Sequence, residues 1–176
     1  MHKSPKLFIE AVFRASDVLI LAPHGGNIEV GTTEIASFLA GDRYSFYSLS
    51  APNHKPSHLF DEPRCVELVQ KSLLVIAIHG MRENSEKIVI GGLYDSELLI
   101  DRLRESGFEA ESAERYPLLA GVHPNNICNR GILKRGVQIE VATRMRDRLM
   151  RESGMRERFK KVVDVFIAHA LQKSRS

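Results

Sequence analysis

The sequence predicts an α/β fold, a three-layer sandwich with a mixed, largely parallel sheet. Short apolar runs, such as residues 17–22 and 73–78, alternate along the chain with helix-like patterns. The chain has 176 residues, of which 43% are hydrophobic, and no repeat or linker divides it. This length and composition predict a single domain over residues 1–176 that buries a substantial core.

Five segments have the composition of strands. They are residues 17–22, 43–49, 73–78, 87–91 and 136–141. Continuous apolar strands are typical of sheets that helices cover on both faces. Residues 51–61 and 117–135 are rich in proline, asparagine or glycine, which predicts loops.

Five further segments have the periodicity of helices. They are residues 30–40, 63–71, 94–106, 142–151 and 155–172. Gly41 ends the first of these helices, and Pro63 stands in the first turn of the second. In the last helix apolar residues recur at core spacing: Phe159, Val162, Val163, Phe166 and Ile167.

The formal net charge of +3 is small. It does not imply nucleic acid, and it suits an acidic substrate. Cys65 and Cys128 cannot form a disulfide framework, so we expect reduced, partly buried thiols. No segment has transmembrane length, and Glu10 and Arg14 interrupt the apolar N-terminal run. We expect a monomeric protein without a membrane partner or signal peptide, cytoplasmic or released by lysis.

Histidines follow two of the apolar strands. His24 comes after residues 17–22, with Gly25, Gly26 and Glu29 behind it, and His79 comes after residues 73–78. The carboxyl ends of parallel strands collect functional residues at one edge of a sheet. Two histidines and a glutamate form one standard ligand set for catalytic Zn²⁺, which keeps a fourth position open. The pattern predicts that His24, Glu29 and His79 bind zinc.

Other interpretations of this segment remain open. His24 could be a loop residue bonded to backbone. The His24-Gly25-Gly26 turn could instead cradle phosphate or a nucleotide, which would make the protein a non-catalytic binding module. The following helix, however, lacks the glycine pattern of nucleotide-binding loops, and Glu29 would repel a phosphate.

The remaining glutamate and histidine residues are weaker candidates for metal ligands. Glu34 competes with Glu29 as a ligand, but it is rotated away on the helix and we expect it in solvent. His54 and His58 have helical spacing, yet the surrounding prolines argue against a helix and favour a substrate-side or surface loop. His123 is an alternative third ligand. His2 and His169, near the chain ends, are expected to be surface or packing residues.

Three segments carry a resemblance to a known family. Residues 24–32 (HGGNIEVGT), the pair His79-Gly80 and the segment GVQIEV from Gly136 resemble the poly-γ-glutamate hydrolase family. The likeness covers roughly residues 17 to 150. It implies a zinc-dependent hydrolase of a type first described from bacteriophages, with a fold similar to the zinc carboxypeptidases. Related architecture occurs in N-formylglutamate amidohydrolases.

The resemblance also implies roles for individual residues. His24, Glu29 and His79 match the zinc ligands, and Glu140 matches the general base. Zinc lowers the pKa of its bound water toward about 7, and Glu140 would take the water proton and pass it to the leaving amine. The plain alternative for Glu140 is a solvated edge-strand residue or an ion pair with Arg144.

A γ-linked polyglutamate carries one free α-carboxylate per residue, so its recognition requires cations and amides. Arg82 follows His79 by three positions and could clamp a carboxylate or the developing oxyanion. Asn126 and Arg130 lie in the long loop and are further substrate-binding candidates. Plain surface charge is the alternative for both arginines. Four arginines of the C-terminal helices are expected to form one solvated face: Arg144, Arg146, Arg148 and Arg151.

The candidate zinc ligands, together with the family resemblance, imply a zinc-dependent amide hydrolase that acts on γ-linked polyglutamate or a related acidic peptide. An exopeptidase or an N-acyl amino acid deacylase of the same fold is the near alternative. A non-catalytic phosphate-binding module is the alternative from another class.

Overall fold

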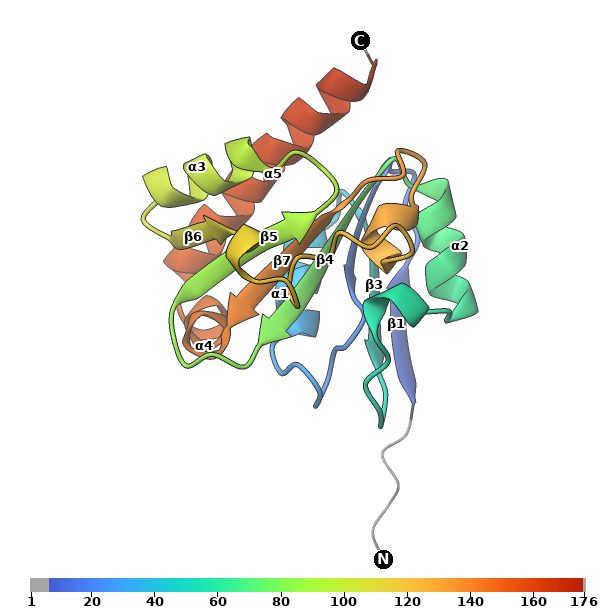
Figure 1. Cartoon of the computed structure of the whole chain (residues 1–176), viewed down its shortest axis with the longest axis horizontal. Helices are drawn as coiled ribbons and strands as arrows, with labels where there is room; N and C mark the ends of the chain where they lie inside the picture. Colours follow the sequence, from blue (N-terminus) through green and yellow to red (C-terminus); the bar gives the residue numbers. More distant parts are fainter. Residues whose placement is uncertain (1–6, 176) are drawn as a thin grey trace, which may run out of the picture.

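The computed structural model describes residues 7–175, and within them the chain forms one seven-stranded sheet with helices on both faces (Figure 1). The spatial order of the strands is β1-β3-β2-β4-β7-β5-β6. Their bounds are β1 Phe8–Val12, β2 Val18–Ala22, β3 Ser45–Ser50, β4 Leu74–Met81, β5 Lys87–Gly92, β6 Glu109–Ser112 and β7 Val137–Ala142.

The sheet is mixed and largely parallel, as the sequence predicts. Strand β2 pairs in parallel with β3 and β4, β4 with β7, and β5 with β6. The pairs β1–β3 and β5–β7 are antiparallel. The parallel strands β2, β4 and β7 therefore end at the same edge of the sheet, and the sequence places its chemistry-bearing residues there.

The helices are α1 Thr32–Ala40, α2 Pro63–Lys71, α3 Glu97–Glu105, α4 Thr143–Arg151 and α5 Ser153–Arg175. Four of them (α1, α3, α4 and α5) pack on one face of the sheet, and α2 packs on the other (Figure 1). The second face is also covered by residues 117–135, which contain a short 3-10 helix, η3 Ile127–Arg130. Another 3-10 turn, η1 Ser57–Leu59, interrupts the predicted loop at 51–61.

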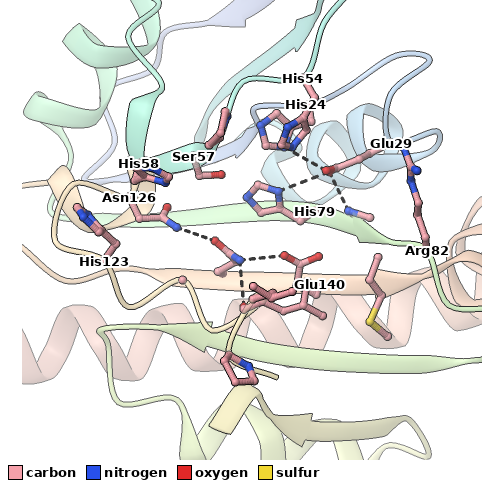
Figure 2. Close-up of a pocket in the computed structure, with 18 of the residues that line it drawn as sticks. His24, Glu29, His54, Ser57, His58, His79, Arg82, His123, Asn126 and Glu140 are labelled. Atoms are coloured by element: carbon pink, nitrogen blue, oxygen red, sulfur yellow. Dashed lines mark hydrogen bonds and ion pairs between the residues drawn. The ribbon is translucent and has the colours of Figure 1, made fainter. Parts of the chain in front are cut away.

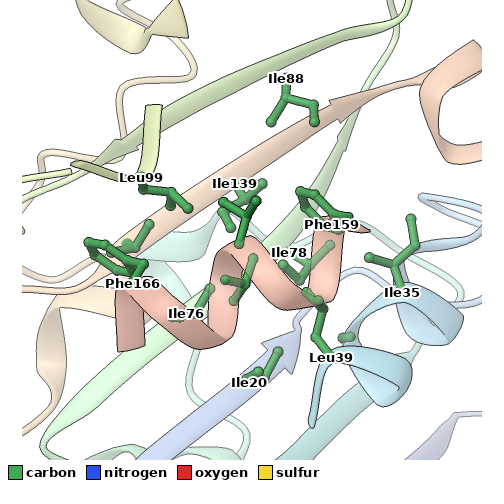
Figure 3. Close-up of a cluster of buried hydrophobic side chains, with 14 of the residues drawn as sticks. Ile20, Ile35, Leu39, Ile76, Ile78, Ile88, Leu99, Ile139, Phe159 and Phe166 are labelled. Carbon is green, nitrogen blue, oxygen red and sulfur yellow. The ribbon is translucent and has the colours of Figure 1, made fainter. Parts of the chain in front are cut away.

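The larger core lies between the central strands and α5. Ile20, Ile76 and Ile139 point from β2, β4 and β7 toward Phe159 and Phe166 of α5 (Figure 3). All five side chains are at most 2% exposed. Successive residues of a strand point to opposite faces, so alternate positions of the same strands fill the smaller core under α2.

Two strands were not predicted from the sequence. Strand β1 (Phe8–Val12) lies at one edge with Glu10 at its centre, and the four-residue β6 (Glu109–Ser112) forms the other edge. Edge strands are partly solvated, so their sequences lack the apolar continuity that marks central strands. Pairing with β3 and β5 determines their conformation.

Other expectations of the sequence have mixed outcomes. Cys65 and Cys128 are free thiols, as predicted, but both are fully buried. His169 is exposed on α5, and His2 lies outside the described residues. Within residues 7–175, none of the helices combines the length and apolar character that crossing a membrane requires.

Candidate metal centre

Strand pairing brings His24, His79 and Glu140 to one edge of the sheet. His79 and Glu140 are direct neighbours across the parallel pair β4–β7. His24 lies just beyond the end of β2, which pairs with β4. The turn after His24 then places Glu29 before α1, and the Glu29 amide donates to the His24 carbonyl at 3.0 Å.

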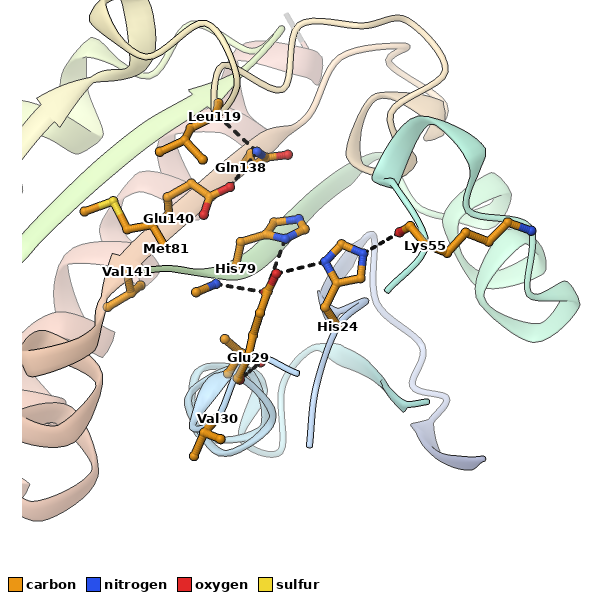
Figure 4. Close-up of polar contacts among 12 residues, drawn as sticks. His24, Glu29, Val30, Lys55, His79, Met81, Leu119, Gln138, Glu140 and Val141 are labelled. Atoms are coloured by element: carbon orange, nitrogen blue, oxygen red, sulfur yellow. Dashed lines mark hydrogen bonds and ion pairs between the residues drawn. The ribbon is translucent and has the colours of Figure 1, made fainter. Parts of the chain in front are cut away.

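The Glu29 carboxylate lies between two histidine rings (Figure 4). His24 Nδ1 is 3.1 Å from Glu29 Oε1, and His79 Nδ1 is 3.5 Å from Glu29 Oε2. The Gly80 amide also donates to Oε2 at 2.9 Å. Both imidazoles are only 4% exposed, so the cluster is held in a fixed arrangement largely out of solvent.

The hydrogen bond of His24 Nε2 determines which nitrogen of this ring carries the proton. Nε2 lies 2.6 Å from the carbonyl oxygen of Lys55 and must donate a proton to it. In the neutral ring Nδ1 is then an acceptor, and it faces the carboxylate of Glu29, which is also an acceptor. A proton or a metal cation must lie between two acceptors at this distance. Metal-bound histidines usually donate their other N–H to a carbonyl in this way.

The donor set fits Zn²⁺. Two ligands that each lie about 2.0–2.2 Å from a tetrahedral zinc are about 3.3–3.6 Å apart, close to the separations of the His24–Glu29 and His79–Glu29 pairs. In His79, Nδ1 is the nitrogen that meets Glu29, whereas Nε2 is buried without a hydrogen-bond partner among the described residues. Imidazole nitrogens and a carboxylate oxygen are the ligands that catalytic zinc sites use.

A third histidine approaches the same cluster. The ring centroids of His54 and His24 are 4.1 Å apart, against 5.0 Å for His24 and His79. Among the described residues, the group whose ligand atoms all lie within 4.8 Å of one another consists of His24, Glu29 and His54, without His79. The sequence did not single out His54 as a ligand, because nothing in its local pattern says where the loop at 51–61 folds.

Glu140 is buried beside the cluster and takes part in a polar chain. The Gln138 side-chain amide donates to Glu140 Oε1 at 2.9 Å (Figure 4), and Asn126 donates to Gln138 at 2.9 Å. Burial raises the pKa of Glu140, although the charge of His79 opposes the shift. Gln138 was missed from sequence, yet its position two residues before Glu140 puts both side chains on one face of β7.

The pKa values of Glu29 and His79 shift in opposite directions. Burial alone would raise the pKa of Glu29, but the hydrogen bonds with His24 and His79 outweigh it and hold the pKa far below its ordinary value. Burial alone would lower the pKa of His79, but the contact with Glu29 and the charge of Glu140 raise it. The cluster therefore retains its carboxylate as an anion, which is the form that binds a cation.

A cavity of about 710 Å³ opens over the cluster (Figure 2). It is within the range of ordinary ligand sites. Arg82 lies on one side of the His-Glu-His cluster, and His58 and His123 lie on the other, with ring centroids 5.1 Å apart. Asn126 also lines the cavity, so both Arg82 and Asn126 are placed where substrate could reach them.

Three other residues considered from the sequence, Arg130, Glu34 and Arg144, do not line the cavity. Arg130 does not line the cavity, and its guanidinium donates to the Phe60 carbonyl at 2.6 Å. The expectation that it binds substrate directly therefore finds no support in its position. Glu34 is exposed on α1, as expected. Arg144 pairs with Glu86 at 3.2 Å, so the structure does not contain the alternative pair between Arg144 and Glu140.

Arg146 corrects the expectation of a solvated arginine face on α4. Its side chain is only 7% exposed and donates to three backbone carbonyls, those of Val30, Met81 and Val141. These carbonyls follow Glu29, His79 and Glu140 by one or two residues. An added Cβ at Gly80 would lie 2.6 Å from Arg146 Nη1, so this position of β4 requires glycine. Arg146 joins the three segments that carry the cluster.

We expect Arg146→Met to lower the free energy of unfolding by about 2–4 kcal/mol, because each buried carbonyl that loses its donor costs about 1–3 kcal/mol. Denaturant unfolding without added metal measures this change. Arg144→Met is the matched control, since its partner Glu86 is reached at the surface, and it should change stability by less than about 0.5 kcal/mol. Equal effects of the two variants would contradict the role assigned to Arg146.

The fold and the buried His-Glu-His cluster define an α/β protein with a candidate metal centre at the strand ends. Residues 3–170 match the model of the poly-γ-glutamate hydrolase family. The chain belongs to this family, which is a family of enzymes.

Curated relatives come from Bacillus subtilis (strain 168). The SPβ prophage-derived protein YoqZ is 36% identical over 137 residues, which is 73% of this chain and 50% of the relative. YndL is 36% identical over 142 residues, covering 76% of this chain and 56% of the relative. The chain thus spans about half the length of these relatives.

Two solved structures share the fold along almost the whole chain. A zinc-free structure of YndL has a TM-score of 0.84 at 30% identity and covers 96% of this chain and 93% of its own. A bacteriophage poly-γ-glutamate hydrolase has a TM-score of 0.81 at 24% identity with the same coverage. The second likeness establishes the common fold. The three-layer α/β architecture predicted from sequence is confirmed.

Proposed function

We propose that this chain is a zinc-dependent hydrolase that cleaves amide bonds in γ-linked polyglutamate. The observation that carries the proposal is the placement of His24 Nδ1 and His79 Nδ1 against the two oxygens of Glu29. Membership of the poly-γ-glutamate hydrolase family and the zinc-free description of the YndL structure support the choice of metal and substrate.

Different residues of the site would bind the metal, transfer the proton and orient the base. Zinc, when bound by His24, Glu29 and His79, would lower the pKa of water toward about 7 and polarise a carbonyl group. Glu140 accepts the proton of the attacking water and delivers it to the leaving amine. Gln138 holds one oxygen of Glu140 by its hydrogen bond, which keeps the carboxylate oriented at the edge of the cluster.

The cavity suits an acidic chain. Arg82 lies on one side of the cluster and Asn126 on the other, so a substrate carboxylate could be bound on either side of the scissile bond. Arginine grips a carboxylate with two parallel hydrogen bonds, and Asn126 offers an amide. Arg130 contributes indirectly, because it holds the backbone at Phe60.

Incubation of the zinc-loaded protein with γ-linked and α-linked polyglutamate, followed by sizing of the products, tests the proposal. We expect cleavage of the γ-linked polymer only, and loss of cleavage after zinc is removed with a chelator. Intermediate oligomers indicate internal cleavage, whereas single units indicate an exopeptidase. Turnover that persists in rigorously metal-free protein would contradict the zinc assignment.

We expect Arg82→Ala to raise the KM for an acidic γ-glutamyl substrate about two- to fivefold, because an exposed ion pair contributes up to about 1 kcal/mol. The KM for a neutral amide analogue should change little. Steady-state kinetics with both substrates measures the difference. Arg64→Ala, an exposed arginine on α2 outside the cavity lining, is the control. An equal rise for both substrates would exclude a carboxylate clamp.

A further inference from the structure

His54 lies against the proposed zinc ligands although it comes from a loop rather than a strand. Its ring is stacked at a tilt of 41° on His24, and its ligand atoms lie within 4.8 Å of those of His24 and Glu29 (Figure 2). Unlike His24 and His79, which are buried, His54 is exposed. A third imidazole beside a two-histidine, one-carboxylate set is a candidate for a further bond to the metal.

The backbone beside His54 is tied to the cluster. The carbonyl of Lys55, the next residue, accepts the hydrogen bond from His24 Nε2 at 2.6 Å. Further along, Phe60 is buried and its carbonyl accepts from Arg130. These contacts hold the backbone of the loop beside the cluster, whereas the imidazole of His54 is exposed.

The distance that separates His54 from coordination is small. Two nitrogen ligands of one zinc are about 3.3–4.2 Å apart, depending on the angle between them. Separations of up to 4.8 Å therefore close with a shift of about 1 Å. Exposed side chains make such rotamer changes within nanoseconds. His79 cannot move in this way, because it lies buried on β4.

We propose that His54 is a fourth, reversible protein ligand that closes the open position of the metal in the resting enzyme. This inference rests on the proposed zinc site. Catalytic zinc needs one position that is free for water or substrate, whereas four protein ligands close the site. A substrate that enters the cavity displaces the His54 imidazole, and this opens the fourth position. His54 thus limits reaction until substrate is bound.

Cobalt replacement tests this assignment directly, because the visible absorption of Co²⁺ reports the number and kind of its ligands. Wild type, His54→Ala and His58→Ala are titrated with Co²⁺, and their Zn²⁺ Kd values are measured by competition with a chelator. His58 is the matched control, since it lines the same cavity without belonging to the cluster. Thermal unfolding of each variant confirms that it is folded.

We expect His54→Ala to change the cobalt spectrum and to raise the Zn²⁺ Kd about 10-fold or more, since even an outer-shell partner is worth about 10- to 100-fold in affinity. His58→Ala should retain the wild-type spectrum. A short γ-glutamyl oligomer added to wild type should shift its spectrum toward that of His54→Ala.

The results that contradict these expectations distinguish the ligand role of His54, its displacement by substrate and zinc binding itself. A wild-type spectrum and Kd in His54→Ala overturn the ligand role of His54 and leave the zinc hydrolase proposal intact. A changed His54→Ala spectrum, combined with a wild-type spectrum that the oligomer does not alter, overturns displacement by substrate. Failure of wild type to bind either Co²⁺ or Zn²⁺ overturns the zinc proposal and this inference together.

Discussion

Glu140→Gln is expected to lower kcat by about 10²- to 10⁴-fold, which is the usual contribution of a general base. Glutamine has nearly the same shape and can still accept the hydrogen bond from Gln138, so the local packing stays in place. It cannot take a proton from water at neutral pH. Zinc content should therefore remain at the wild-type level while turnover is lost. Metal analysis and steady-state kinetics on the same preparation measure both quantities.

Glu34→Gln is the matched control for this variant. It removes one carboxylate from an exposed position on α1, and both kcat and zinc content should stay near their wild-type values. Full turnover by Glu140→Gln would show that another group accepts the proton. Loss of zinc from Glu140→Gln would instead show that Glu140 contributes to metal binding.

His24→Ala is expected to raise the Zn²⁺ Kd by more than 100-fold and to abolish hydrolysis. The substitution removes a proposed ligand together with the imidazole that connects Glu29 to the carbonyl of Lys55. Replacement of an outer-shell partner already costs about 10- to 100-fold in metal affinity, so loss of a ligand should cost more. Chelator competition measures the affinity, and product sizing measures hydrolysis.

His169→Ala provides the control, because His169 is exposed on α5. It should bind zinc as wild type does. Circular dichroism and thermal unfolding without metal check that His24→Ala is folded. A folded His24→Ala protein with wild-type zinc affinity would remove His24 from the ligand set.

Much of the fold could be predicted because the central strands have a strong local pattern. The segments at 17–22 and 73–78 are continuous apolar runs. Strand β2 (Val18–Ala22) occupies the first, whereas β4 (Leu74–Met81) occupies the second and extends three residues further, so that it includes His79. Helix α2 runs from Pro63 to Lys71, as its N-terminal proline and apolar periodicity indicate. The edge strands β1 and β6 could not be found, because their conformation depends on partners far away in the chain.

The candidate site was predictable in the parts that follow directly from strand order. His24 follows β2, His79 lies near the end of the neighbouring parallel strand β4, and Glu29 lies five residues after His24. Residues whose position depends on long-range packing were not predictable. The arginines of α4 look alike in sequence, yet Arg146 is buried against three carbonyls while Arg144 lies at the surface.

By itself the sequence determined the class of fold, the edge of the sheet where chemistry collects and the His-Gly-Gly motif that carries the family likeness. These features are local, since short-range periodicity and turn-forming residues produce them. Only the tertiary structure decided which side chains share the cavity: it brought in His54 and Gln138, turned Arg130 toward Phe60 and buried Arg146. The physical reason is that each of these contacts joins segments whose separation in space depends on how the loops and helices pack over the finished sheet.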